Sequence, residues 1–236
     1  MPIRAVLFDK DGTLLDYNLT WGPINVAAAE IAAGGDPVLA DRLLAEGGMD
    51  RVTMVTRSGS LLAAGHTIEI AAAWVKAGSP LSLNDLSYRL DALFTASATG
   101  SVPIGDLEAC FSALRAEGLT LGIASSDNEA SIHLMLDHLG LAQHISFVAG
   151  YDSGHGVKPG PGMVHAFASA LSLEPSQIAV VGDNSHDIDM GRSAGAGLVI
   201  GVLSGTGDAA SLEPIADICL SDISKLPAFL APHLAA

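Results

Sequence analysis

From about residue 105 onward, the chain alternates between helical patterns and short apolar runs. This alternation is typical of a parallel sheet that helices cover on both faces. The predicted strands are Ile3 to Phe8, Leu119 to Ala124, Ile145 to Ala149, Ile178 to Val181, Gly197 to Val202 and Ile215 to Leu220. The predicted helices are 106–117, 129–139, 162–171, 185–194 and 223–230. We therefore predict an α/β fold with a doubly wound parallel sheet.

Residues 17–100 separate the first strand from the rest of this pattern. They are rich in Ala and Leu with helical spacing, and glycine-containing segments interrupt them. The predicted helices of this insert are 23–33, 38–46, 67–77 and 84–96. We therefore expect two domains: an α/β core formed by residues 1–16 and 101–236, and an inserted α-helical cap domain formed by residues 17–100.

Composition and charge narrow the classes of protein. Of the 236 residues, 49% are hydrophobic and 16% are charged, which favours a globular chain over a disordered one. The formal net charge of −15 disfavours nucleic acid and anionic membranes as partners. Neither a membrane span nor a signal peptide is predicted, so a cytoplasmic monomer or homodimer is the expectation. Cys110 and Cys219 are expected to be buried free thiols.

Two acids, Asp9 and Asp11, directly follow the apolar residues Ala5 to Phe8. Carboxylates at the end of a buried strand repel each other and are driven toward their neutral forms unless a cation lies between them. A hard divalent ion, Mg²⁺, fits such oxygen ligands. The alternative is an ordinary strand followed by an Asp-Gly turn.

Further polar side chains follow the other predicted strands. Ser125 and Ser126 follow the second strand, Lys158 comes after the third, and Asp183 and Asp187 follow the fourth. Because ligands collect at the carboxyl ends of strands in such a sheet, we expect these side chains to lie together with Asp9 and Asp11. Taken singly, the serines could start a helix, Lys158 could be an exposed loop residue, and Asp187 could be an ordinary N-terminal helix acid.

This set of residues has the chemistry that phosphoryl transfer needs. Asp9 is a candidate nucleophile toward phosphorus, and Asp11 is a candidate proton donor and acceptor. Asp9, the backbone carbonyl of Asp11 and Asp183 could supply three oxygen ligands to Mg²⁺. Lys158 and the Ser125 hydroxyl could bind the phosphoryl oxygens, with Asp187 in support.

The chain resembles the haloacid dehalogenase superfamily of phosphohydrolases over its whole length. The matching motifs are Asp9-Lys10-Asp11-Gly12-Thr13-Leu14, Ser125, Lys158-Pro159 and Gly182-Asp183-x-x-x-Asp187. The insert resembles the type 1 cap of that superfamily, and the tail from Gly201 to Gly205 resembles the phosphoglycolate phosphatase branch. The resemblance implies a Mg²⁺ cofactor, a phospho-aspartate at Asp9, acid–base catalysis by Asp11, and phosphate contacts from Ser125 and Lys158. Ser126 is expected to bind phosphate as well, and Thr13 to support the site.

The resemblance favours a phosphatase that acts on a small phosphorylated metabolite, either phosphoglycolate-like or a sugar phosphate. The second acid, Asp11, argues against the dehalogenase and phosphonatase members of the superfamily. A phosphomutase, and a non-catalytic binding or regulatory protein, remain as alternatives. Two departures from the family pattern are Ser125-Ser126 in place of Thr-Asn and the unusual segment from Asp16 to Trp21. Within the insert, Arg57 is our candidate for binding a substrate carboxylate through its guanidinium group.

Overall fold

The computed structural model describes residues 1–234 and contains a six-stranded, fully parallel sheet. Its strand order is β3-β2-β1-β4-β5-β6, so the chain winds outward from β1 in both directions. The strands are β1 (Ala5–Phe8), β2 (Thr120–Ala124), β3 (Ile145–Ala149), β4 (Ile178–Gly182), β5 (Leu198–Val202) and β6 (Ile218–Leu220). The prediction of an α/β fold with a doubly wound parallel sheet is confirmed.

Residues of β1 alternate between two apolar clusters, one on each face of the sheet. Val6 and Phe8 pack into one cluster, whereas Ala5 and Leu7 pack into the other. Such alternation follows from the two-residue period of a strand, and it requires helices on both faces. The helices of this part are α6 (Leu107–Ala116), α7 (Glu129–His138), α8 (Gly162–Leu171), α9 (Ser185–Ala194), α10 (Ala209–Leu212) and α11 (Leu226–Leu230).

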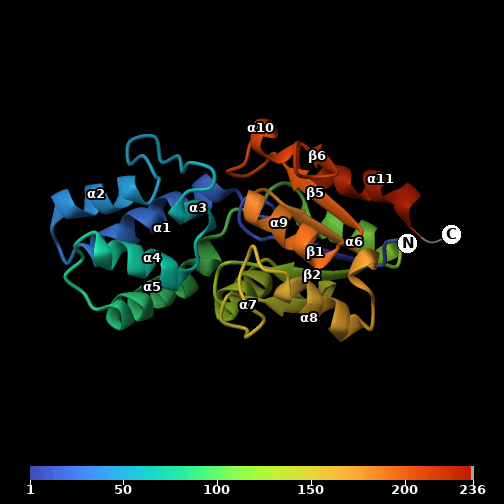
Figure 1. Cartoon of the computed structure of the whole chain (residues 1–236), viewed down its shortest axis with the longest axis horizontal. Helices are drawn as coiled ribbons and strands as arrows, with labels where there is room; N and C mark the ends of the chain where they lie inside the picture. Colours follow the sequence, from blue (N-terminus) through green and yellow to red (C-terminus); the bar gives the residue numbers. More distant parts are fainter. Residues whose placement is uncertain (235–236) are drawn as a thin grey trace.

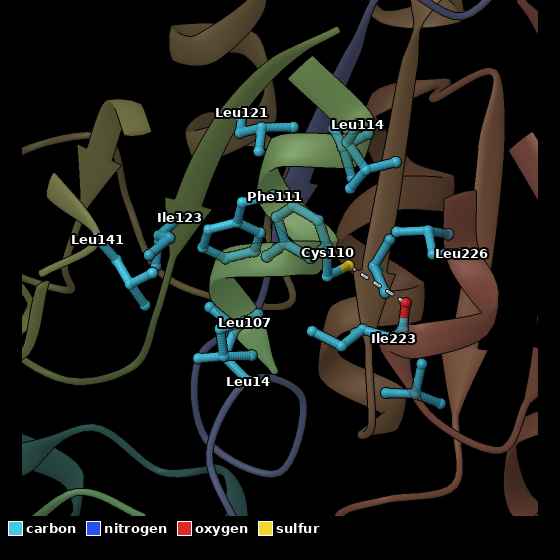
Figure 2. Close-up of a cluster of buried hydrophobic side chains, with 14 of the residues drawn as sticks. Leu14, Leu107, Cys110, Phe111, Leu114, Leu121, Ile123, Leu141, Ile223 and Leu226 are labelled. Atoms are coloured by element: carbon cyan, nitrogen blue, oxygen red, sulfur yellow. Dashed lines mark hydrogen bonds between the residues drawn. The ribbon is translucent and has the colours of Figure 1, made fainter. Parts of the chain in front are cut away.

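Figure 2 shows the cluster that contains Phe111 of α6, with Leu121 of β2 on one side and Leu226 of α11 on the other. The Cys110 thiol lies within this cluster and donates a hydrogen bond to the carbonyl oxygen of Ile223, with a sulfur–oxygen distance of 3.4 Å. Cys110 is therefore buried and free, as predicted. Cys219 is also free but only half-buried, because β6 is an edge strand.

The helices of residues 17–100 pack around a separate apolar cluster that contains Leu43, Trp74 and Leu90. They are α1 (Tyr17–Ala32), α2 (Pro37–Glu46), α3 (Leu61–Ala64), α4 (Thr67–Lys76) and α5 (Leu83–Ser97). We call residues 17–100 the helical insert. Figure 1 shows it at one end of the molecule, whereas the N-terminus and α11 lie toward the other end. The proposed boundaries of two domains stay a prediction.

Several predicted boundaries are wrong. Helix α1 begins at Tyr17, not at Pro23, because the Asp16 side chain caps it by accepting a hydrogen bond from the backbone N–H of Leu19 at 2.9 Å. The four-residue helix α3 was not predicted. The last strand begins at Ile218 rather than at Ile215, and the final helix divides into a 3-10 turn at Ile223–Lys225 followed by α11. None of the described helices is long and apolar enough to span a membrane.

Candidate active site

A cavity lies between the carboxyl ends of the central strands and the helical insert. The sheet side contributes residues that follow β1, β2, β3 and β4, and the insert contributes residues of α1, α3, α4 and α5. The predicted site residues that line it are Asp9, Asp11, Ser125, Ser126, Lys158, Asp183 and Asp187. The structure therefore brings together side chains that are up to 178 positions apart in the sequence, from Asp9 to Asp187.

Asp9 and Asp187 hold the Lys158 ammonium between them. Lys158 Nζ lies 2.5 Å from Asp9 Oδ1 and 2.6 Å from Asp187 Oδ1, and all three side chains are buried. Burial raises the pKa of Asp9 to about 6; the Asp187 carboxylate adds to this shift, and the Lys158 ammonium opposes it. Burial alone would lower the pKa of Lys158, but the carboxylates of Asp187 and Asp9 raise it above its ordinary value.

Asp183 is fixed by the segment that follows β5. Its Oδ2 accepts hydrogen bonds from the backbone N–H of Thr206 at 2.7 Å and from the Thr206 hydroxyl at 3.2 Å. The Thr13 hydroxyl lies 3.5 Å from Asp183 Oδ1. Burial raises the pKa of Asp183 well above its usual value, and the Asp9 and Asp187 carboxylates add to this effect. A proton or a cation is therefore favoured at Asp183.

Glycines let the backbone approach Asp183 closely. A β-carbon at Gly12 would lie 2.5 Å from the Asp183 carboxyl, and one at Gly205 would lie 2.0 Å from Asp183 Oδ2. Gly12 also has a φ of 88°, a left-handed conformation that favours glycine. These two contacts explain why any larger residue at either position would displace the Asp183 carboxyl.

Three buried carboxylates form a group that fits a metal ion. Single oxygens of Asp9, Asp183 and Asp187 lie within 4.8 Å of one another. Asp187 is already engaged, because its Oδ1 accepts from Lys158 and its Oδ2 accepts from the Asn184 backbone N–H at 3.0 Å. Asp9 and Asp183 therefore have the freer oxygens. An all-oxygen set of buried carboxylates with raised pKa values matches the preference of Mg²⁺ for hard ligands.

Asp11 lies in a second charged group, which the sequence did not reveal. The Lys10 ammonium lies 2.8 Å from Asp11 Oδ2 and 3.1 Å from Asp127 Oδ2, and Lys10 is only 2% exposed. The indole N–H of Trp21 in α1 donates a hydrogen bond to Asp11 Oδ1 at 2.6 Å. Burial raises the pKa of Asp11, while the Lys10 ammonium opposes that shift. Because burial favours the protonated form of Asp11 and the Lys10 ammonium favours its carboxylate, Asp11 can act both as a proton donor and as a proton acceptor.

The serines after β2 have different surroundings. The Ser125 hydroxyl is buried and accepts a hydrogen bond from the backbone N–H of Asp127 at 3.1 Å. The Ser126 hydroxyl donates to the carbonyl oxygen of Ala64, in the helical insert, at 3.2 Å. Neither serine starts a helix, because Asn128 caps α7 by accepting from the backbone N–H of Ser131. The helix-start interpretation is therefore wrong.

The other single-residue alternatives can also be compared with the structure. Lys158 is 8% exposed, so it is not an exposed loop lysine. Asp187 does belong to the first turn of α9, but it also contacts Lys158. Thr13 is buried beside Asp183 and does not line the cavity. Arg57 is exposed and lies outside the residues that line the cavity.

Comparison with known proteins identifies the family to which the chain belongs. Residues 3–195 match the family model described as haloacid dehalogenase-like hydrolase. The chain belongs to this family. The resemblance seen in the motifs is confirmed, and with it the prediction of an enzyme of the hydrolase class.

Individual relatives in the family match the chain over nearly its full length. A phosphoglycolate phosphatase of Salmonella typhimurium is 29% identical over 254 residues, which covers 98% of this chain and 94% of the relative. The crystal structure of a predicted phosphoglycolate phosphatase from Haemophilus somnus is similar with a TM-score of 0.72 and 19% identity, covering 96% and 97% of the two chains. A family hydrolase from Deinococcus radiodurans, solved with bound phosphate and sodium, is 25% identical with a TM-score of 0.67, covering 98% and 96%.

Proposed function

We propose that this member of the haloacid dehalogenase-like hydrolases is a Mg²⁺-dependent phosphatase. It hydrolyses the phosphate monoester of a small metabolite through an aspartyl-phosphate on Asp9. The observation that carries this proposal is the Asp9 carboxylate, buried at the base of the cavity with the Lys158 ammonium 2.5 Å away. The phosphoglycolate phosphatases among its relatives support the same reaction class.

In the first step, an Asp9 carboxylate oxygen attacks phosphorus and the bond from phosphorus to the alcohol oxygen breaks. Asp11 gives its proton to that leaving oxygen. In the second step, a water molecule attacks the phosphorus of the phospho-aspartate and Asp11 takes the proton of this water. Inorganic phosphate then leaves, and Asp9 is regenerated. The raised pKa of Asp11 favours the protonated acid that the first step requires.

Lys158 neutralises charge on the phosphoryl group during transfer, and the contact with Asp187 keeps its ammonium at Asp9. The Ser125 and Ser126 hydroxyls, at the end of β2, would bind the other phosphoryl oxygens. Oriented donors of this kind stabilise charge without having to reorganise during the reaction.

Asp9, Asp183 and the backbone carbonyl of Asp11 would hold the Mg²⁺ ion. Among the described residues, no hydrogen-bond donor is assigned to the Asp11 carbonyl oxygen, so it is available as a ligand. When bound, Mg²⁺ supplies positive charge that offsets the repulsion between the carboxylates and the phosphate. We also propose that the helical insert acts as a cap, since its residues form the wall of the cavity opposite Asp9.

Hydrolysis of p-nitrophenyl phosphate tests this proposal. The wild-type protein should release p-nitrophenol with MgCl₂ and lose this activity in EDTA. Asp9→Asn should be inactive under both conditions, and Asp106→Asn, which alters a surface acid that only caps α6, is the matched control. Inactivity of the wild type with Mg²⁺, or full activity of Asp9→Asn, would contradict the proposal.

A further inference from the structure

Among the residues that the structure describes, the cavity wall that faces the leaving part of a substrate contains no lysine or arginine. In the described chain, the insert contributes mainly apolar surface to this wall, from residues such as Leu62, Ile70 and Phe94. Its polar contributors are Tyr17, Asn25 and Thr67, together with the indole of Trp21. The insert therefore offers the substrate a wall without positive charge.

Three of the side-chain donors of that wall, those of Tyr17, Asn25 and Trp21, are engaged within the protein, whereas the buried Thr67 hydroxyl has no hydrogen-bond partner among the described residues. The Tyr17 hydroxyl donates to the carbonyl oxygen of Leu62, and the Asn25 side-chain amide donates to the Tyr17 oxygen at 3.5 Å. The Trp21 N–H donates to Asp11 Oδ1. A carboxylate that entered this space would therefore find one free neutral donor and no cation on the insert, which does not replace its hydration shell.

The opposite wall adds negative charge. Five aspartates line the cavity, and both nearby lysines are each held between two of them: Lys158 between Asp9 and Asp187, Lys10 between Asp11 and Asp127. These ammonium groups are therefore already paired.

The remaining basic side chain in the described lining is His186, which precedes Asp187 in the first turn of α9. Arg57, at the exposed surface of the insert, is not part of the lining. Neither side chain places a permanent positive charge on the wall that faces the leaving group.

We infer that the alcohol released by this enzyme is uncharged, and that phosphate esters with a carboxylate next to the phosphate are poor substrates. This inference rests on the proposed phosphatase function. An unpaired carboxylate would lose its hydration in the cavity without gaining a cationic partner from the insert. An uncharged alcohol has no such cost, and its carbon atoms would bury apolar area against Leu62, Ile70 and Phe94.

A matched pair of esters tests this inference: 2-phosphoglycolate and its amide, 2-phosphoglycolamide, which have nearly the same size and differ in charge. With wild-type protein and Mg²⁺, we expect kcat/KM to be at least about tenfold higher for the amide. Equal or higher kcat/KM for 2-phosphoglycolate would overturn the inference and leave the phosphatase proposal intact.

Binding separates failure of the inference from failure of the proposed function. Calorimetric titration of Asp9→Asn with each ester measures Kd without turnover, and the amide should bind at least about tenfold more tightly. Tighter or equal binding of 2-phosphoglycolate would overturn the inference. If p-nitrophenyl phosphate and both esters resist hydrolysis, the proposed function fails, and the two Kd values still decide the question of charge.

A variant that adds the missing cation is the second test. Ala63 lies in the lining and is half-buried, so the variant Ala63→Lys places an ammonium at the wall without filling the packed core. Ala63→Lys should raise the kcat/KM ratio of 2-phosphoglycolate to the amide by about tenfold, whereas Ala63→Gln should leave this ratio near that of the wild type. An unchanged ratio in Ala63→Lys would overturn the inference.

Discussion

The indole N–H of Trp21, in the first helix of the insert, donates a hydrogen bond to Asp11 Oδ1 in the loop after β1, with a nitrogen–oxygen distance of 2.6 Å. The Trp21 ring also packs edge-on against Phe94 of α5, with ring centroids 5.0 Å apart. Asp11, the proposed proton donor, is thus hydrogen-bonded to the helical insert, which forms the opposite wall of the cavity. The position of the insert and the orientation of Asp11 are therefore linked.

Trp21→Phe should lower kcat, because it keeps an aromatic ring against Phe94 but removes the donor to Asp11. Hydrogen bonds to charged groups contribute about 1.5–3 kcal/mol, so a fall of about 10- to 150-fold in kcat on p-nitrophenyl phosphate is expected. Trp74→Phe is the matched control, since the Trp74 N–H donates to the Leu43 carbonyl inside the insert, away from the cavity. It should lower stability and spare kcat; unchanged kcat in Trp21→Phe would contradict the proposed role of the bond.

Lys10→Met should destabilise the protein, because it leaves Asp11 and Asp127 as buried acids without their cation. Breaking a buried ion pair costs about 3–5 kcal/mol in the free energy of unfolding. Urea denaturation at neutral pH measures this change. The double variant Lys10→Met/Asp127→Asn should recover part of the loss. Wild-type stability of Lys10→Met would show that the buried contacts of Lys10 are energetically neutral.

Lys158→Met should reduce kcat/KM by about a hundredfold or more, since it removes the positive charge beside Asp9. Steady-state kinetics on p-nitrophenyl phosphate in saturating Mg²⁺ measures the effect. Lys225→Met, which alters an exposed lysine of the C-terminal part, provides the control and should leave kcat/KM unchanged. A loss of less than threefold in Lys158→Met would argue against a role for this ammonium in the transfer step.

The stabilisation by Mg²⁺ should increase with pH. The folded-state pKa values of Asp9, at about 6, and of Asp183 lie above their unfolded-state values near 3.8. The folded protein therefore binds more protons than the unfolded chain in this window, and in EDTA the contribution of these acids to stability falls as pH rises. Mg²⁺ replaces the protons, so the gain in Tm from MgCl₂ should be larger at pH 8 than at pH 5.

At a Mg²⁺ concentration of 100 Kd, binding adds about 2.7 kcal/mol, which corresponds to roughly 5–10 °C in Tm for a chain of this size. Thermal denaturation with MgCl₂ or EDTA at both pH values provides the measurement. Asp183→Asn should lose most of the gain at pH 8. An equal gain at both pH values would contradict the account of these buried acids.

The sequence predicts the strands well where apolar runs end in polar residues. Ile145–Ala149 and the helices Gly162–Leu171 and Ser185–Ala194 match their predicted bounds. The N-terminus of α1 was missed because Pro23 is typical of a helix start, whereas Asp16 caps this helix seven residues earlier. The capping contact of Asp16 therefore sets the start of α1, rather than the preference of Pro23 for the first turn of a helix.

The sequence also predicts which side chains gather at the cavity, because strand ends can be located from the apolar pattern. It does not predict the contact of Lys10 with Asp127 or that of Thr206 with Asp183. These partners are 117 and 23 residues apart, and no local pattern links them. The charge of Arg57 and its place in the predicted loop Val55 to Gly59 favour a substrate contact, but nothing in the sequence shows that its side chain faces solvent.

The central claim is that Asp9 carries the phosphoryl group, and trapping the phospho-enzyme tests it most directly. Asp11→Asn should still form the phospho-aspartate but should hydrolyse it slowly, because the water lacks its proton acceptor. Rapid acid quench of Asp11→Asn during turnover of p-nitrophenyl phosphate with Mg²⁺, followed by peptide mass spectrometry, should find one phosphoryl group on Asp9 and none in the double variant Asp9→Asn/Asp11→Asn. A phosphoryl group on another residue, or undiminished hydrolysis by Asp9→Asn, would contradict this account.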